Sequence, residues 1–124
     1  MQGLLLFAHG ARDPRWALPF IDIQQRVKGA TPAMPVELAF LEFMTPNLID
    51  AGASLAQAGC TLVDVLPLFL GAGGHVRKDL PELMDQLKRQ HPAVLWQLRP
   101  AIGEIASVVQ AMAEAAITGM TPKS

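Results

Sequence analysis

Four short apolar runs alternate along this chain with stretches whose apolar residues recur at helical spacing. The runs are Leu4 to Ala8, Val36 to Leu41, Thr61 to Leu70 and Val94 to Leu98. The first and third are too apolar to expose either face to water, which is typical of strands in a buried parallel sheet. We therefore predict an α/β fold: a single three-layer domain over residues 1–124, with a four-stranded, mostly parallel sheet flanked by helices. The order of the strands stays open.

Local signals place the helices between these strands. A capping side chain followed by proline favours a helix start, and a glycine after the last periodic residue favours its end. A final alanine-rich helix is expected after the fourth strand. The signals, in chain order, are Asp13-Pro14, Gly29, Thr45-Pro46, Gly59, Asp79 and the stretch Ile102 to Ile117.

Composition narrows the classes of partner. The formal net charge is -1, and the basic residues are scattered, so we expect no binding of nucleic acid. The lone cysteine, Cys60, excludes an internal disulfide and is expected to be a buried small hydrophobe in a reducing compartment. The apolar N-terminal stretch is too short for a signal peptide or a membrane span. These features predict a cytoplasmic protein that does not associate with membranes.

The balance of apolar and charged residues favours self-association. Hydrophobic residues make up 51% of the chain and charged residues only 17%, so some apolar surface is expected to form an oligomer interface. One candidate is apolar surface around the crevice that open α/β sheets form beyond the carboxyl ends of their strands. The other is a stripe on the final helix, which packing inside one subunit would explain equally well. That stripe consists of Ile105, Val108, Val109, Met112 and Ala116.

Two histidines and a glutamate follow three of the predicted strands. His9 ends the first strand, Glu42 follows the second, and His75 lies in the loop after the third. The carboxyl ends of parallel strands share one edge, where ligands of open α/β sheets bind. Two imidazoles and a carboxylate suit a divalent first-row metal such as Fe²⁺, Co²⁺ or Ni²⁺. The alternative is structural, with hydrogen-bonded histidines and a solvated Glu42; for His91, before Pro92 at the opposite edge, we expect that structural role.

Basic residues gather near the same edge. Arg12 and Arg15 follow the first strand, and Arg77 and Lys78 follow the third. Cations near a helix N-terminus oppose the helix dipole, so an anionic ligand would explain them. The glycine-rich segment 71–74 permits close approach of a ligand to the backbone, but it lacks the lysine and hydroxyl of a P-loop, which disfavours a nucleotide.

Three segments resemble the small sirohydrochlorin chelatases of the CbiX type. They are Leu6 to Arg15, which contains His-Gly-Ala-Arg-Asp-Pro; Ala39 to Glu42; and Leu66 to Asp79, which contains Pro-Leu-Phe-Leu-Gly-Ala-Gly-Gly-His. The resemblance implies insertion of Co²⁺ or Fe²⁺ into sirohydrochlorin without ATP, on the route to cobalamin or sirohaem. It implies no cofactor beyond the metal substrate, and Ni²⁺ stays open as an alternative metal.

The resemblance also assigns roles to residues. It implies that His9 and His75 are the metal-binding and catalytic pair, with Glu42 as a third metal ligand. Sirohydrochlorin carries many carboxylates, so Arg12, Arg15, Arg77 and Lys78, with Gly73 and Gly74, are the expected substrate-binding residues. It further implies that the chain corresponds to half of a two-domain chelatase and that a homodimer rebuilds the cleft.

Two alternatives to a chelatase stay open. The chain could bind metal or tetrapyrrole without turnover, as a carrier or a partner subunit. A phosphohistidine site at His9-Gly10 is disfavoured, because Ala8 stands where an arginine normally precedes such a histidine.

Overall fold

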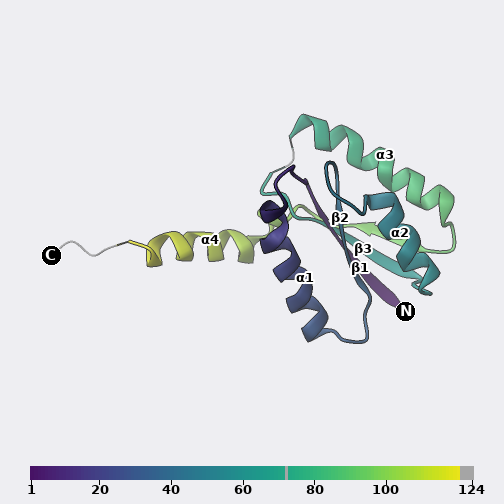
Figure 1. The fold of residues 1–124 in the computed structure, drawn as a ribbon, viewed down its shortest axis with the longest axis horizontal. Helices are drawn as coiled ribbons and strands as arrows, with labels where there is room; N and C mark the ends of the chain where they lie inside the picture. The colour runs from purple at the N-terminus through teal and green to yellow at the C-terminus, as the bar shows by residue number, and fades with distance from the viewer. Residues whose placement is uncertain (72, 121–124) are drawn as a thin grey trace.

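The sheet is parallel throughout and has its first strand in the interior. The computed structural model describes residues 1–71 and 73–120, with only the backbone of His75. Its strands are β1 (Gln2–Ala8), β2 (Val36–Phe40), β3 (Leu62–Pro67) and β4 (Leu95–Leu98), in the order β2-β1-β3-β4 (Figure 1). All three neighbouring pairs are parallel. The predicted α/β fold is confirmed, and the strand order is now known.

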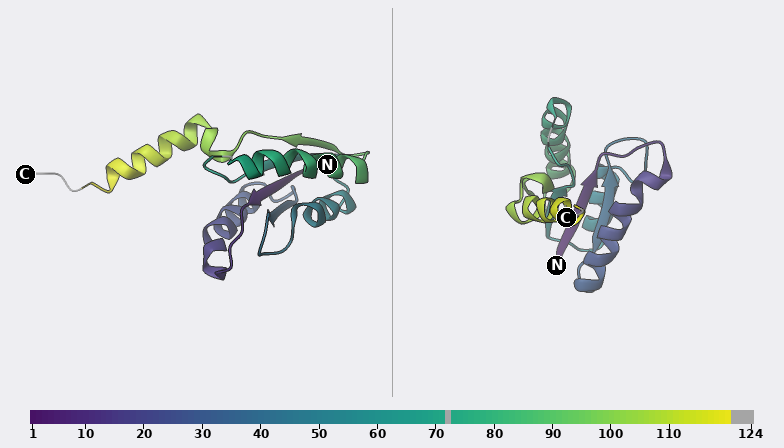
Figure 2. Two further views of the ribbon diagram at one scale, coloured as in Figure 1. Left: turned by 90° about the horizontal axis from the view of Figure 1, so that it is seen from above. Right: turned by 90° about the vertical axis from the view of Figure 1, so that its left-hand side faces the viewer.

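Helices cover the two faces of the sheet unequally. The helical elements are η1 (Pro14–Ala17), α1 (Leu18–Ala30), α2 (Leu48–Gln57), α3 (Gly74–Gln90), η2 (Ile102–Glu104) and α4 (Ala106–Thr118). The right-hand view of Figure 2 shows α1 and α3 on opposite sides of β1. Right-handed crossovers explain this, because the chain steps from β1 to β2 in one direction and then to β3 and β4 in the other. The final helix, α4, extends away from the sheet (Figure 1).

The apolar character of β1 follows from this position. Leu5 and Phe7 belong to the core beneath α2 and α3, whereas Leu4, Leu6 and Ala8 belong to the core beneath α1. Successive side chains of a strand point to opposite faces, so a central strand with both faces covered needs apolar residues at every position.

Several predicted helix boundaries are wrong. The Asp13 carboxylate caps η1 by accepting from the backbone N–H of Arg15, and α1 then runs through Gly29 to Ala30. Asn47, not Thr45, caps α2 by accepting from the N–H of Asp50 at 2.8 Å. The side chain nearest to the free N–H groups satisfies them, and this depends on backbone geometry that a sequence motif does not specify.

The region after β3 differs most from expectation. The strand ends at Pro67, whose ring nitrogen has no proton for the sheet ladder, rather than at Leu70. The helix predicted from Asp79 begins at Gly74, with Gly73 as its N-cap. His75 therefore lies in the first turn of α3 and not in a loop. The predicted helix Ile102 to Ile117 is divided at Ile105 into η2 and α4.

Packing explains the two remaining singled-out residues. Cys60 is 3% exposed, and burial raises the pKa of its thiol, as expected for a buried small hydrophobe. His91 ends α3, and its carbonyl accepts a hydrogen bond from Trp96 Nε1 at 3.2 Å. Within the described residues, no helix has the length and apolarity to cross a membrane.

A partly buried ion pair joins β3 to the end of β4, and its removal should lower stability. Arg99 donates from Nε and Nη2 to Asp64 Oδ2, at 2.9 and 2.6 Å, and the Asp64 side chain is only 10% exposed. Arg99→Ala leaves that carboxylate without its partner, so we expect a loss of about 1–3 kcal/mol in the free energy of unfolding. Urea titration measures it. Arg26→Ala, which breaks an exposed pair with Asp22, is the control and should cost less than about 0.5 kcal/mol. Equal losses of unfolding free energy in the two variants would show that the burial of Asp64 does not make its ion pair more important than an exposed one.

Candidate active site

The strand order brings the predicted ligands to one edge of the sheet. β1 lies between β2 and β3. The connection from β1 leads to β2 on one side, whereas β3 and β4 follow on the other side. At such a switch point the loops after neighbouring strands part and leave a crevice in open α/β sheets. His9 directly follows β1, Glu42 lies just beyond β2, and the backbone of His75 lies in the first turn of α3 after β3. The His75 side chain is outside the described part of the structure.

Backbone hydrogen bonds hold His9 beside Glu42. The N–H of Leu41 donates to the Ala8 carbonyl at 2.9 Å, and the N–H of Glu42 donates to the His9 carbonyl at 3.1 Å. The ladder between β1 and β2 thus continues past both strands. His9 Nε2 lies 3.5 Å from Glu42 Oε1, and the two side chains are 47% and 46% exposed. The pair is accessible to an ion or ligand from outside.

Gly10 permits this approach of the two loops. It has a φ of +92°, and a Cβ at this position would lie 1.9 Å from the carbonyl oxygen of Glu42. Only a glycine combines that backbone conformation with the absence of a side chain. The contact between His9 and Glu42 therefore requires glycine at position 10.

Phe69 restricts the His9 imidazole. The two rings meet edge to face with centroids 5.8 Å apart, and Phe69 packs in the same manner against Phe7 at 5.8 Å. Phe69 is only 7% exposed, so the His9 imidazole packs against a buried side chain. Phe69 lies beyond the end of β3, although the apolar run predicted a strand through Leu70. The continuation of that run past Pro67 was the only sequence signal for its role beside His9.

Arg12 and Phe43 form a second contact beside the pair. The Arg12 guanidinium lies 4.5 Å from the centroid of the Phe43 ring, within range of a cation–π interaction. Phe43 has a φ of +66°, and the N–H of Met44 donates across it to the Glu42 carbonyl at 2.8 Å. This tight turn is strained for a residue with a side chain. It leaves the ring 55% exposed next to Glu42, a position no sequence motif signalled.

The other predicted substrate-binding residues differ in their surroundings. Arg15 donates from Nη2 to Asp13 Oδ2 at 2.7 Å; this holds the pKa of the Asp13 carboxyl below its ordinary value and raises that of Arg15. Arg77 and Lys78 are exposed near the start of α3. A Cβ at Gly73 or Gly74 would meet nothing within 4 Å, so packing among the described residues does not require these glycines. They leave the N-terminus of α3 open to an anion.

The spacing of His9 and Glu42 suits two ligands of one ion. Ligand atoms that each lie about 2.1 Å from a tetrahedral ion are about 3.4 Å apart, close to the 3.5 Å between the two side chains. An imidazole and a carboxylate accept Fe²⁺, Co²⁺ and Ni²⁺. Among the side chains that the structure describes, no group of three or more metal-binding residues gathers. The third predicted ligand, His75, is not among those side chains.

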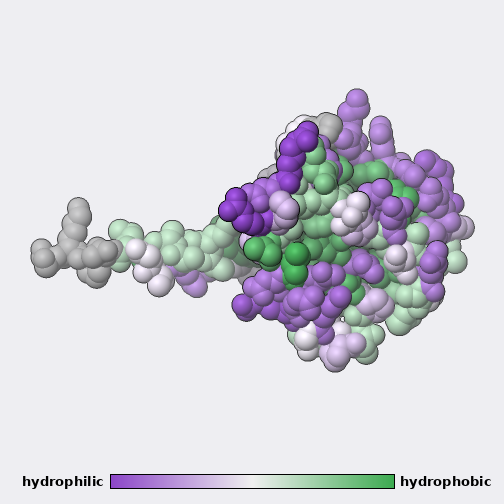
Figure 3. Space-filling model, viewed as in Figure 1, coloured by the Kyte–Doolittle hydropathy of each residue, from purple (hydrophilic) through white to green (hydrophobic). Residues whose placement is uncertain are grey.

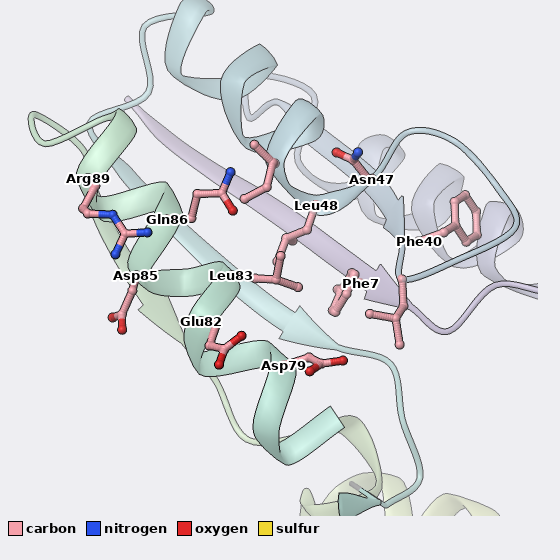
Figure 4. Close-up of a pocket in the computed structure, with 12 residues that line it drawn as sticks. Phe7, Phe40, Asn47, Leu48, Asp79, Glu82, Leu83, Asp85, Gln86 and Arg89 are labelled. Carbon is pink, nitrogen blue, oxygen red and sulfur yellow. The ribbon is translucent and has the colours of Figure 1, made fainter. Parts of the chain in front are cut away.

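A pocket of about 590 Å³ opens next to this edge, between α2 and α3. Phe7 and Leu41 form part of its floor, and Figure 4 shows Leu48 of α2 and Leu83 of α3 facing each other across it. The wall supplied by α3 is mainly acidic, with Asp79, Glu82 and Asp85 besides Arg89. Carboxylates repel an anionic ligand, so this pocket does not suit the anion that the basic residues indicate.

The chain matches known proteins over most of its length. Residues 3–118 match the CbiX family. It is 30% identical to the sirohydrochlorin cobaltochelatase of Sulfurisphaera tokodaii over 91 residues, which are 71% of this chain and 72% of that protein. It is 26% identical to the Sulfolobus acidocaldarius enzyme of the same name over 118 residues, which are 95% and 94% of the two chains.

Solved structures share the fold. A cobalamin (vitamin B12) biosynthesis CbiX protein from Marinobacter aquaeolei superimposes with a TM-score of 0.84 and 27% identity, over 95% of this chain and 96% of that one. The sirohydrochlorin chelatase SirB from Bacillus subtilis, in complex with cobalt, gives a TM-score of 0.81 at 24% identity over 95% of this chain but 50% of its own. The match to the family model and the relative at 30% identity together show that this chain belongs to the CbiX family.

Proposed function

We propose that this protein is a sirohydrochlorin chelatase, which inserts Co²⁺ or Fe²⁺ into sirohydrochlorin without ATP. The observation that carries the proposal is the pair of His9 Nε2 and Glu42 Oε1, 3.5 Å apart at the carboxyl edge of a CbiX-family sheet. Relatives along most of the chain are sirohydrochlorin cobaltochelatases. SirB, which shares the fold, has been solved with cobalt and with Fe³⁺. A cytoplasmic location and a role in making cobalamin or sirohaem belong to the same proposal.

Metal insertion requires a site that binds the ion loosely and accepts protons. The pyrrole N–H groups of the macrocycle must lose their protons as the metal binds their nitrogens. We assign Glu42 and one imidazole to holding the incoming ion, and the other imidazole, of His9 or His75, to accepting the two pyrrole protons one after the other and passing each to solvent. Histidine suits both tasks, because neutral imidazole binds metals and titrates near neutral pH.

Basic groups around the pair would position the tetrapyrrole through its carboxylates. Arg12 lies above Phe43 next to Glu42, and the start of α3 carries Arg77 and Lys78 behind the open glycines Gly73 and Gly74. Guanidinium groups bind carboxylates with two parallel hydrogen bonds. Arg15 can take part only by sharing or leaving its contact with Asp13.

A homodimer is part of the proposal. One copy of this chain spans half of the SirB chain, so a second copy would supply the other half of a comparable cleft. The exposed edge that carries His9 and Glu42 would then face its symmetry mate, enclosing the macrocycle between two subunits.

An anaerobic absorbance assay tests the function. Purified protein is mixed with sirohydrochlorin and Co²⁺, Fe²⁺ or Ni²⁺ in turn, and the spectral conversion is compared with the rate without protein. Acceleration by the wild type for Co²⁺ or Fe²⁺ is expected. Tight binding of sirohydrochlorin with no acceleration for any metal would instead indicate a carrier or partner subunit.

Arg12→Ala is expected to raise the KM for sirohydrochlorin about 10- to 150-fold while kcat changes by less than about threefold. A lost charge-assisted hydrogen bond costs about 1.5–3 kcal/mol of binding, and a contact made equally in the ground and transition states affects KM alone. Steady-state kinetics at saturating metal separate the two constants. Arg26→Ala, on α1, removes the same charge elsewhere and should change neither. A fall in kcat with KM unchanged would show that Arg12 acts on the reacting atoms instead.

A further inference from the structure

Phe43 is an exposed aromatic residue at the candidate active site, and the packing of the fold does not explain it. It is 55% exposed, whereas Phe7, Phe40 and Phe69 are each at most 7% exposed. Aromatic rings bury a large apolar area and dominate the energetics of protein cores. A phenylalanine that stays outside the core therefore contributes little to folding and needs another explanation.

The backbone at Phe43 is unfavourable as well. Its φ is +66°, and the hydrogen bond from the N–H of Met44 to the Glu42 carbonyl makes it the centre of a three-residue turn. Such a turn is rare and strained for a residue with a Cβ, whereas glycine adopts it freely. A strained residue that adds little burial indicates a function for its side chain.

Contacts on both sides of Phe43 hold this turn in place. Before it, the N–H of Glu42 donates to the His9 carbonyl at 3.1 Å. After it, the Met44 side chain packs against the core on the α1 side. Backbone strain persists only where the surrounding structure enforces it in this way. The ring of Phe43 is thus held at the surface by the same contacts that place Glu42 beside His9.

The ring lies within reach of a macrocycle placed over the proposed metal pair. Glu42 and Phe43 are consecutive, so their Cα atoms are about 3.8 Å apart. An ion that leaves His9 and Glu42 enters the centre of the tetrapyrrole, which must therefore lie close to both side chains. That centre is flat, conjugated and apolar, and flat ring systems stack on aromatic side chains. Figure 3 shows hydrophilic and hydrophobic surface side by side near the root of α4, which suits a ligand with a charged rim and an apolar centre.

Arg12 leaves the ring of Phe43 available. Its guanidinium lies 4.5 Å from the ring centroid and covers one face, yet the phenylalanine remains 55% exposed. A guanidinium that stacks on a ring keeps the N–H groups in its own plane free to donate to carboxylates. Arg12 and Phe43 can therefore act together, one on the carboxylates at the rim of the ligand and the other on its apolar centre.

We propose that Phe43 binds sirohydrochlorin by stacking against the flat centre of the macrocycle, backed by Arg12 on the other face of its ring. The inference rests on the chelatase proposed above and adds to it the residue that sets the plane of the substrate over His9 and Glu42. The strained turn is then the means by which the ring stays at the surface instead of joining the core.

Phe43→Gly removes the ring and the strain together, so it separates binding from stability. An anaerobic absorbance titration without metal should show the Kd for sirohydrochlorin raised about 5- to 150-fold, the usual effect of losing one aromatic stack. The midpoint of urea unfolding should not fall, because glycine accepts the positive φ. Isothermal titration with Co²⁺ alone should give the wild-type affinity, because His9 and Glu42 are unchanged. Weaker Co²⁺ binding would show that Phe43 acts through Glu42, and the stacking would be wrong.

Two further substitutions at this position test the flat ring itself. Phe43→Tyr keeps the ring and should restore the Kd of the wild type. Phe43→Leu keeps apolar bulk without a ring and should bind more weakly than Phe43→Tyr; equal binding by the two would overturn the stacking. The control elsewhere is Ile21→Ala on α1, which removes an apolar side chain that is 41% exposed and should leave the Kd unchanged. A lower mass of Phe43→Gly by light scattering would assign the ring to a contact between copies instead.

Binding without metal and turnover with metal are independent outcomes. Weaker binding by Phe43→Gly, together with a wild type that accelerates no metal insertion, supports the stacking and contradicts the chelatase. A wild type that inserts metal, with the same KM for sirohydrochlorin in Phe43→Gly, contradicts the stacking alone. A wild type that binds no sirohydrochlorin overturns both.

Discussion

Replacement of His9 by alanine is expected to lower kcat for metal insertion by about 10²–10⁴-fold, the usual range for loss of a general acid or base. The imidazole lies 3.5 Å from Glu42 and is 47% exposed, so its loss leaves the core intact. The free energy of unfolding should therefore change by less than about 1 kcal/mol. The anaerobic absorbance assay measures the rate, and urea titration measures the stability.

His91→Ala is the matched control for this variant. His91 ends α3 at the opposite edge, with its ring 6.0 Å from that of Trp96, so its removal should affect stability rather than turnover. A His9→Ala protein with full activity would rule out a catalytic role for His9. Equal loss of activity in both variants would indicate a general effect on folding.

Gly10→Ala is expected to lower the free energy of unfolding by more than about 2 kcal/mol. A left-handed backbone costs a residue with a Cβ about 1–2 kcal/mol. The added carbon would also lie 1.9 Å from the Glu42 carbonyl oxygen, so one loop must move. That movement separates Glu42 from His9, and we expect metal insertion to fall with it. Urea titration with an unchanged slope would show that stability alone has changed.

Gly29→Ala provides the control for the glycine substitution. A Cβ at Gly29, inside α1, would meet nothing within 4 Å, so alanine should be tolerated and should stabilise the helix by about 0.5–1 kcal/mol. If Gly10→Ala were equally harmless, the close approach of the two loops would not be what holds His9 beside Glu42.

Sequence patterns predicted the features that follow from local chemistry. Unbroken apolar runs indicated buried parallel strands, because a strand covered on both faces has no polar position. The positions of His9 and Glu42 directly after such runs placed them at the carboxyl edge, where the structure has them. Burial of Cys60 likewise followed from its residue type and its place before β3.

Helix starts after β3 were less predictable. A glycine-rich segment usually indicates a loop, yet Gly73 caps α3 and Gly74 begins it. From local sequence alone, a helix start at Asp79 was as plausible as one at Gly74. Such weak local preferences are overridden by the packing of the whole helix. Val76 and Leu80, which are buried in the core, decide that the helix begins before them.

The sequence by itself determined the fold class, the strands and the edge at which the functional residues collect, since these depend on spacing and polarity along the chain. Tertiary structure alone decided the strand order, the 3.5 Å approach of His9 to Glu42, the strained turn at Phe43 and the outward course of α4. Each of these depends on contacts between segments far apart in the chain. Gly103 is one example, because its N–H donates to the Phe69 carbonyl and a side chain there would collide with Leu70, two contacts that no local sequence pattern predicts.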